Sequence, residues 1–209
     1  MYAHRGVHSS DADENTVGAF RRAAKKLGGF ECDVRLSKDG VPVVIHDATL
    51  LRTHGHRARV SDLRAARLSK IGVPLLRDVL PFSEEARVIL DLKVQPVKLI
   101  DKICRLCARL GLSTDPLIFL VWEDFVPLPG WPPNLALYRA RDYRFGTGDG
   151  TWTGIACKYS GTHINHVSIR RALEAGLHVN LYAPDKSKYP QMKRMYGRVC
   201  SITRDVICS

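Results

Sequence analysis

The sequence has no long apolar run. No stretch approaches the ~18 consecutive apolar residues of a transmembrane helix. The N-terminal segment MYAHRGVHSS also lacks the apolar core of a secretory signal peptide. These absences predict a chain with neither a membrane span nor a leader, and we therefore expect a cytoplasmic location.

Cysteine is present, but not in a metal-binding pattern. The pair Cys104-x-x-Cys107 has no second CxxC and no zinc-type histidine spacing in the chain. The pair falls in a helical pattern, which favours two thiols on a buried helix face over a redox or metal pair. Without a secretion signal, reduced thiols are expected.

Acidic residues are fewer than basic ones. The chain has 32 Lys and Arg against 21 Asp and Glu, a formal net charge of +11. This balance favours anionic partners such as phosphate esters, acidic membrane surfaces or nucleic acid. The basic residues are spread along the chain without a nucleic-acid-binding motif, so no specific nucleic-acid partner is expected.

The length and the apolar content predict one domain. The 209 residues are 45% hydrophobic, which suits a single globular domain over residues 1–209. Short apolar runs rich in Val and Ile alternate with helical patterns, as in parallel α/β folds. The runs lie at 30–36, 41–47, 87–94, 116–122, 135–140, 153–159, 178–184 and 198–203, and the helical patterns at 13–28, 60–68, 73–86, 96–111 and 166–176.

The number of strands predicts a short TIM (β/α)8 barrel. If YAHRG at 2–6 is the first strand and 41–47 is a β-hairpin return on the second, eight parallel strands remain. The connection at 141–152 is rich in glycine and shows no helical pattern. A doubly wound open sheet is the alternative, and the absence of a GxGxxG or P-loop signature weighs against it.

Carboxylates interrupt two of the predicted strands. Glu31 and Asp33 are two residues apart and therefore face the same way, as do Asp91 and Lys93. Three inward carboxylates would repel one another unless a cation lies among them, and oxygen ligands favour Mg²⁺ or Ca²⁺. Ordinary salt bridges with the many arginines are the alternative.

Two histidines stand at predicted strand ends, His4 beside Arg5 and His46 beside Asp47. Histidine at such a position can act as a general acid or base near neutral pH. A cation, Arg5, Lys93 and two histidines together suit a phosphodiester, because positive charge holds the non-bridging oxygens while the histidines transfer protons.

These residues occur in an ordered set of motifs. AHRG, ENT, FECDVRLSKDGVPVVIHDATLLRT, VPLLRDVL and VILDLKV together resemble the glycerophosphodiester phosphodiesterase family over roughly residues 3–94. The resemblance implies a TIM barrel, a divalent cation, and hydrolysis of glycerophosphodiesters to glycerol 3-phosphate and an alcohol. It implies His4 and His46 as the catalytic pair, Glu31 and Asp33 as metal ligands, Arg5 and Lys93 as phosphate contacts, and Asn15 as a hydrogen-bonding support. The third expected metal ligand is Asp91, the other inward carboxylate.

The chain also departs from the family's pattern. Asp91 stands where the family usually has Glu, as in the related sphingomyelinase D enzymes. Tyr182 replaces a tryptophan of the final strands and would keep an aromatic wall for the substrate, and Thr203-Arg204 replaces a closing Thr-Asp. Two alternatives therefore stay open. One is a lysophospholipase D or sphingomyelinase D-like enzyme that binds a lysolipid through Trp122, Phe125 and Trp131; the other is a non-catalytic phosphate-binding protein.

Overall fold

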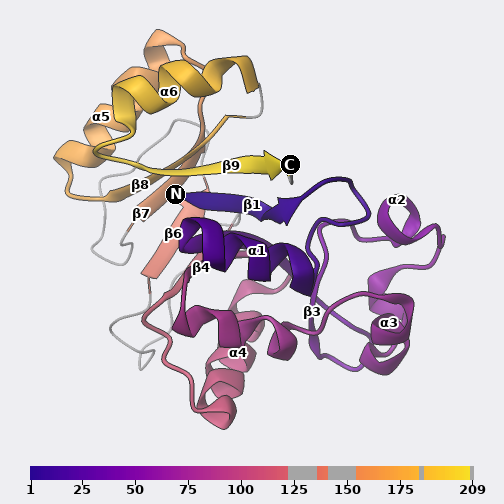
Figure 1. Cartoon of the computed structure of the whole chain (residues 1–209). Coiled ribbons are helices and arrows are strands. Elements are labelled where there is room, and N and C mark those ends of the chain that lie inside the picture. The colour runs from indigo at the N-terminus through magenta and orange to yellow at the C-terminus, as the bar shows by residue number, and fades with distance from the viewer. Residues whose placement is uncertain (122–135, 141–153, 184–185, 208–209) are drawn as a thin grey trace.

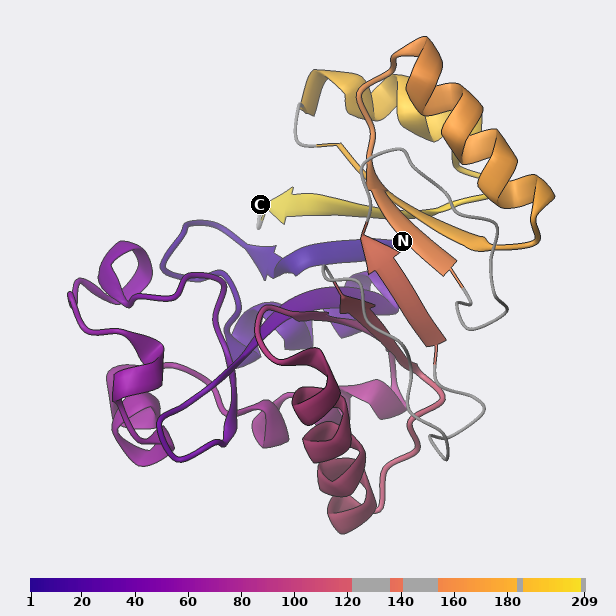
Figure 2. The same ribbon diagram turned by 180° about the vertical axis from the view of Figure 1, so that it is seen from behind.

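Eight parallel strands form a closed ring in the computed structural model, which describes residues 1–121, 136–140, 154–183 and 186–207 (Figures 1 and 2). The strands are β1 (Tyr2–His8), β2 (Gly29–Leu36), β4 (Arg87–Leu92), β5 (Leu117–Val121), β6 (Ala136–Ala140), β7 (Gly154–Lys158), β8 (His178–Tyr182) and β9 (Ser201–Ile207). Each pairs in parallel with the next, and β1 closes the ring by pairing with both β9 and β2. The predicted TIM barrel is confirmed.

The predicted hairpin return is also present. Strand β3 (Pro42–Val44) pairs antiparallel with the end of β2, with Val44 opposite Val34. The turn between the two strands contains Gly40 at φ 71°, a conformation that glycine adopts without steric cost. This return brings His46 back toward the barrel.

Among the described residues, the four helices of eight residues or more lie outside the ring: α1 (Val17–Leu27), α4 (Pro96–Leu110), α5 (His163–Glu174) and α6 (Tyr189–Tyr196) (Figure 1). The Thr16 side chain caps α1 by accepting a hydrogen bond from the Ala19 N–H. In α4 the buried residues Leu99, Ile103 and Cys107 recur at helical spacing, and Cys104 is half-buried. The expected helix-face cysteines are therefore found there.

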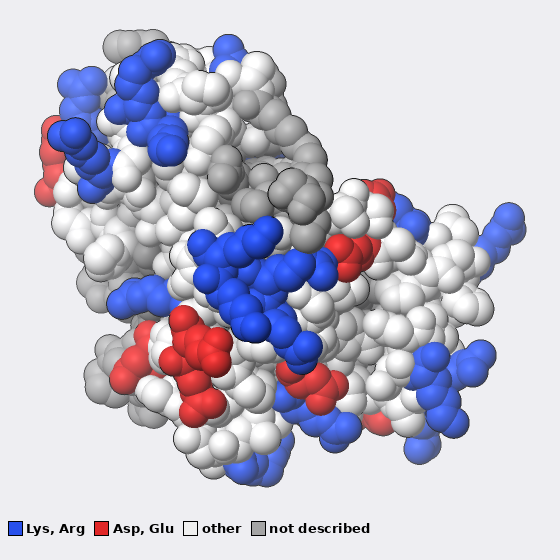
Figure 3. Space-filling model, in the orientation of Figure 1, with Lys and Arg blue, Asp and Glu red and all other residues white. Residues whose placement is uncertain are grey.

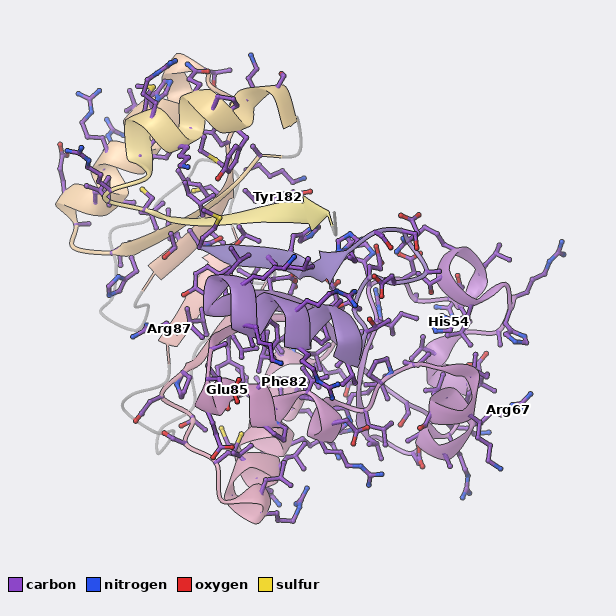
Figure 4. The ribbon with its side chains drawn as sticks, viewed as in Figure 1. His54, Arg67, Phe82, Glu85, Arg87 and Tyr182 are labelled. Carbon is purple, nitrogen blue, oxygen red and sulfur yellow. The ribbon has the colours of Figure 1, made fainter. Side chains whose placement is uncertain are left out.

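The segment between β3 and β4 forms a lobe beside the barrel. It contains α2 (Leu51–His54), the 3-10 helix η1 (Val60–Asp62) and α3 (Ala65–Ile71), with His54 and Arg67 both in this lobe (Figure 4). Its apolar residues pack into a cluster of their own around Leu50 and Leu68. The lobe is therefore a small packed unit, and after it the chain re-enters the barrel at β4.

The helix predicted over 73–86 is not formed as one α-helix. The structure has two short 3-10 helices instead, η2 (Leu76–Asp78) and η3 (Leu80–Glu84). Pro81 has no N–H to donate to the carbonyl of Arg77, so an α-helix cannot continue through this point.

The two sides of the barrel pack against their helices through separate clusters of buried apolar residues. The largest cluster joins β1, β2, β4 and β5 to α1 and α4, through residues such as Phe20, Phe30 and Ile103. A second cluster joins β7, β8 and β9 to α5 and α6, through Leu181, Ile169 and Met192. Within the ranges that the structure describes, no helix has the length and apolar character needed to cross a membrane.

Candidate active site

A cavity of about 260 Å³ opens at the carboxyl ends of the barrel strands. Parallel barrels place their ligand sites at this end, because the βα loops converge there. Seven of the nine site residues predicted from the sequence line the cavity, and Asp33 and Asn15 do not. The lining residues are His4, Arg5, Glu31, His46, Ile89, Asp91, Lys93, Leu120, Ala156, Cys157, Lys158, Asn180, Tyr182 and Thr203.

An irregular backbone in β1 presents Arg5 to the cavity. Arg5 has φ 55° and Gly6 has φ 83°, and the pairing register of β1 with β9 shifts between Ala3 and Val7. A side chain at Gly6 would meet Ala19 of α1 at 2.7 Å, so only glycine fits. The bend points the Arg5 N–H at Glu31 Oε2, at 3.0 Å. Strained backbone of this kind is often found where a side chain must be aimed precisely at a ligand.

Three buried carboxylates meet beside Arg5. Oxygen atoms of Glu31, Asp33 and Asp91 all lie within 4.8 Å of one another. Oxygens that share one Ca²⁺ or Mg²⁺ ion lie at most about 5 Å apart, so the spacing fits a single divalent cation. Burial and the neighbouring Asp33 carboxylate raise the pKa of Glu31 to about 8. A bound cation would reverse this shift, because it favours the charged carboxylate.

Asp33 is buried behind the cavity lining, and its carboxylate makes ion pairs and hydrogen bonds with three residues. Its side chain is ion-paired with Lys93 Nζ at 3.0 Å and with Arg5 Nε at 3.3 Å. Asn15 donates to Asp33 Oδ2 at 2.8 Å, in the supporting position expected for it. Burial raises the pKa of this carboxyl, but Lys93 and Arg5 outweigh that effect and lower it below its ordinary value.

Lys93 joins two of the three carboxylates, because its ammonium group also lies 2.7 Å from Asp91 Oδ2. Burial lowers the pKa of Lys93, but the charges of Asp33 and Asp91 raise it above its ordinary value. Two fixed cations, Arg5 and Lys93, thus face three carboxylates. The cluster keeps a net negative charge when all three carboxyls are ionised, which is a further fit to a divalent ion.

His46 is fixed from two directions. Its Nδ1 lies 2.6 Å from Asp47 Oδ1, and Arg35 donates to its backbone carbonyl at 2.8 Å. A carboxylate on Nδ1 selects the tautomer and orientation of the ring, and leaves Nε2 for another partner. His4 packs against the Tyr182 ring, with 4.7 Å between ring centres, and its Nε2 lies 3.9 Å from Glu31 Oε2.

The wall formed by β7, β8 and β9 has a different character. Asn180 and Thr203 are buried there, and Thr203 Oγ1 donates to Asn180 Oδ1 at 3.0 Å. Lys158, the last residue of β7, adds an amine at the cavity. The sequence pattern predicted no site role for Lys158 or Asn180, and it indicated Thr203 only through the Thr203-Arg204 departure. A polar residue inside an apolar strand pattern was the available signal for Asn180 in HVNLY.

Some sequence predictions lie outside the described residues. These are Trp122, Phe125 and Trp131 of the proposed lipid contact, and the glycine-rich connection at 141–152. For Arg204 the structure describes the backbone in β9 alone.

Comparison with known proteins gives consistent results at the level of sequence. A profile of the glycerophosphoryl diester phosphodiesterase family matches residues 4–114. Glycerophosphodiester phosphodiesterase 1 of Bos taurus is 44% identical over 70 residues, which cover 33% of this chain and 21% of the relative. Probable glycerophosphodiester phosphodiesterase 2 of Mycobacterium tuberculosis is 39% identical over 100 residues, which cover 44% of this chain and 37% of the relative.

Solved structures share the fold along nearly the whole chain. An Oleispira antarctica phosphodiesterase in complex with the product sn-glycerol-3-phosphate superposes with a TM-score of 0.76 at 21% identity, covering 98% of this chain and 91% of that one. A glycerophosphodiester phosphodiesterase of Thermotoga maritima gives a TM-score of 0.74 at 19% identity, covering 99% and 92%. At these identities the similarity establishes the fold alone.

The fold and the cavity together define a TIM-barrel protein whose carboxylate cluster and two histidines lie at the carboxyl end of the strands. The family profile covers more than half of the 209 residues. The chain therefore belongs to the glycerophosphoryl diester phosphodiesterase family. It spans 21% and 37% of the length of the two curated relatives named above.

Proposed function

We propose that residues 1–209 form a single catalytic domain, a metal-dependent phosphodiesterase that hydrolyses glycerophosphodiesters to glycerol 3-phosphate and an alcohol. The observation that carries the proposal is the convergence of two histidines, the carboxylate cluster and two cations on one cavity. Family membership and the names of the relatives support the substrate class. The sn-glycerol-3-phosphate bound to the Oleispira antarctica neighbour supports the product.

The carboxylates are proposed as the ligands of the divalent ion. Glu31, Asp33 and Asp91 would hold Mg²⁺ or Ca²⁺, and their spacing supports that assignment. When bound, the ion would polarise a phosphoryl oxygen and stabilise the charge that develops in the transition state. Arg5 and Lys93 would attract and orient the diester, because their positive charges face the same cavity.

The histidines are proposed as the proton carriers. One would take the proton from the attacking oxygen as the new P–O bond forms, and the other would protonate the alcohol oxygen as its bond to phosphorus breaks. The short contact between Asp47 and His46 Nδ1 supports a fixed ring with Nε2 turned to the reaction. The attacking oxygen would belong to water, or to a substrate hydroxyl that first gives a cyclic phosphate.

The size and charge of the site favour a small soluble substrate. A cavity of about 260 Å³ is small beside the pockets that hold drug-sized ligands. Tyr182 forms part of its wall, where it would contact the glycerol moiety. The net charge of +11 would raise the encounter rate with an anionic diester, so the rate should fall as salt is added.

The test is a parallel assay of the purified chain. Glycerophosphocholine, lysophosphatidylcholine and sphingomyelin are incubated with Mg²⁺ or Ca²⁺, and the products are identified. We expect glycerophosphocholine to give glycerol 3-phosphate and choline, with a higher kcat/KM than either lipid.

A lysophospholipase D or sphingomyelinase D-like activity is the second candidate. The apolar wall of Ile89, Leu120 and Ala156 favours it, because burial of an acyl chain gains about 25 cal/mol per Å². A more than tenfold preference for lysophosphatidylcholine that collapses in Leu120→Ala would replace the first proposal by this one. No turnover of any of the three substrates at any metal concentration would favour a phosphate-binding protein without activity.

A further inference from the structure

One arginine outside the barrel connects several carboxylates around the site. Arg52 lies on α2, in the lobe between β3 and β4. Its Nε donates to Asp47 Oδ2 at 2.8 Å, and its Nη2 donates to Glu14 Oε1. Its Nη1 also lies 3.3 Å from the exposed Asp11. The guanidinium thus joins two separate segments of the chain, one with Asp11 and Glu14 and the other with Asp47.

The first branch leads to His46. Asp47 Oδ2 accepts from Arg52 Nε at 2.8 Å, and Asp47 Oδ1 contacts His46 Nδ1 at 2.6 Å while also accepting from Arg52 Nη2 at 3.3 Å. The hydrogen bond from Arg52 lowers the pKa of Asp47 to about 2. The Asp47 carboxylate therefore stays charged, and it contacts Arg52 and His46 at the same time. Arg52 thus fixes the orientation of the His46 ring through Asp47.

The second branch leads to Arg5. Glu14 is buried, and one of its oxygens accepts from Arg52 while the other accepts from Arg5 Nη1 at 2.9 Å. Arg5 in turn contacts Asp33 at 3.3 Å. Without Arg52, a buried carboxylate would lose one of its two cations, which is costly in a low-dielectric environment.

We infer that Arg52 is a positioning residue that fixes His46 and Arg5 relative to each other, through Asp47 and Glu14, although it does not line the cavity itself. The inference rests on the proposed function, because the benefit of fixing these two side chains is a correctly placed proton carrier and phosphate contact. A small displacement of either group has a large effect on rate.

The geometry requires an arginine in particular. Arg52 uses Nε and Nη2 on two different carboxylates at once, which the planar fork of a guanidinium allows. A lysine has one ammonium centre and can satisfy one of the two partners well. Arg52→Lys should therefore recover part of what Arg52→Gln loses.

The experiment measures kcat and KM for glycerophosphocholine in four single variants. Arg52→Gln should lower kcat about tenfold or more, and Arg52→Lys should fall between it and the wild type. Asp47→Asn tests the branch to His46. Arg105→Gln is the matched control, because Arg105 makes a surface ion pair with Asp101 at 2.9 Å on α4; its kcat should equal that of the wild type.

A double-mutant cycle separates positioning from a general structural role. If Arg52 acts through Asp47, the Asp47→Asn/Arg52→Gln protein should be no slower than the slower single variant by more than about twofold. Multiplied losses would contradict action through Asp47. A lowered melting temperature with unchanged kcat would show that Arg52 stabilises the lobe alone, and would overturn the inference.

A second readout does not depend on turnover. The NMR resonances of the His46 ring should shift in Arg52→Gln and stay in place in Arg105→Gln, because only the first change alters the partner of Asp47. If the wild type cleaves no diester, the proposed function fails, and this measurement still decides the inference. Unmoved His46 resonances in Arg52→Gln would refute it.

Discussion

The two sides of the cavity differ in how their side chains are held. On the side of β1, β2 and β4, charged groups form a continuous network that includes Glu31, Asp33, Asp91, Arg5 and Lys93. On the side of β7, β8 and β9, the wall consists of Ala156, Cys157, Asn180, Tyr182 and Thr203, with Lys158 as its single charged member among the described residues.

This difference indicates that the charged side serves the chemical step and that the other side serves substrate fit. The family profile ends at residue 114, just before β5 begins at Leu117, so it covers the charged side alone. Fixed charges stabilise a developing phosphoryl charge, and small changes in their positions are costly. A neutral wall selects a substrate by size and contact, and it tolerates replacement. Of the departures from the family's pattern, Tyr182 falls in β8 and Arg204 in β9, on that second side. Asp91 falls in β4, on the charged side, where it replaces one carboxylate by another.

Charged residues on the outer surface are not confined to the side of the barrel that carries the charged wall of the cavity. Lys and Arg side chains gather over α1, with acidic groups beside them, on the face seen in Figure 3. Arg22 of α1 is ion-paired with Asp13 at 2.6 Å, and Arg21 and Lys25 are exposed. The expected acidic membrane partner remains a prediction, and the charged side of the cavity is distinct from these solvated helix faces.

Removal of the divalent ion should have the largest effect, because it acts on the centre of the charged side. Exhaustive EDTA treatment should abolish turnover of glycerophosphocholine, since Glu31, Asp33 and Asp91 would then repel one another without the ion. Metal analysis confirms removal, and added Mg²⁺ or Ca²⁺ should restore the rate. Full activity in protein shown to be metal-free would rule out this role of the cluster.

Replacement of either histidine should come next. His46→Ala or His4→Ala should lower kcat at least ~10²-fold, the usual scale for a positioned proton carrier. His178→Ala at the exposed start of β8 is the matched control and should keep full activity. Circular dichroism should show similar melting temperatures for all three proteins, and near wild-type turnover of His46→Ala would end its proposed role.

A change in the wall formed by β7, β8 and β9 should affect substrate binding more than the chemical step. Tyr182→Ala should raise KM for glycerophosphocholine, by about tenfold, with a smaller change in kcat, because it removes a contact surface without removing charge. Tyr182→Phe keeps the ring against His4 and should stay close to the wild type. If Tyr182→Ala lowered kcat as much as His46→Ala does, the two sides would not divide in this way.

The smallest expected effect is a pH dependence of stability. The pKa of Asp47 is lowered from 3.8 to about 2, chiefly by its hydrogen bond from Arg52. Its stabilising contribution is therefore complete above the unfolded value and is lost as the pH falls from 3.8 toward about 2. In urea unfolding, Asp47→Asn should be less stable than the wild type at neutral pH, by about 1 kcal/mol or less for a partly exposed pair.

The difference between Asp47→Asn and the wild type should narrow as the pH is lowered through that window. Asp115→Asn, at an exposed carboxylate before β5, serves as the control for a change of net charge. A difference that stays constant down to the acid limit would contradict the assigned cause.

Local sequence patterns were sufficient to predict the features of the molecule that depend on residues close together in the chain. Strand-length apolar runs and turn signals predicted all eight barrel strands and the hairpin return, although the last strand begins at Ser201 and not at 198. The two-residue spacing of Glu31 and Asp33 predicted that they share a face, because side chains alternate along a strand. The structure brings both residues and the His46-Asp47 pair to the same site.

The remaining features depend on contacts between segments that are distant in the sequence. Arg52 and Glu14 are 38 positions apart, and no local pattern indicates their contact. The left-handed backbone at Arg5 and the lining positions of Asn180 and Lys158 depend on how the closed ring packs against its neighbours. Pairing between distant segments is set by the closure of the barrel and by the pairing of buried charges, whereas local propensity acts over only a few residues.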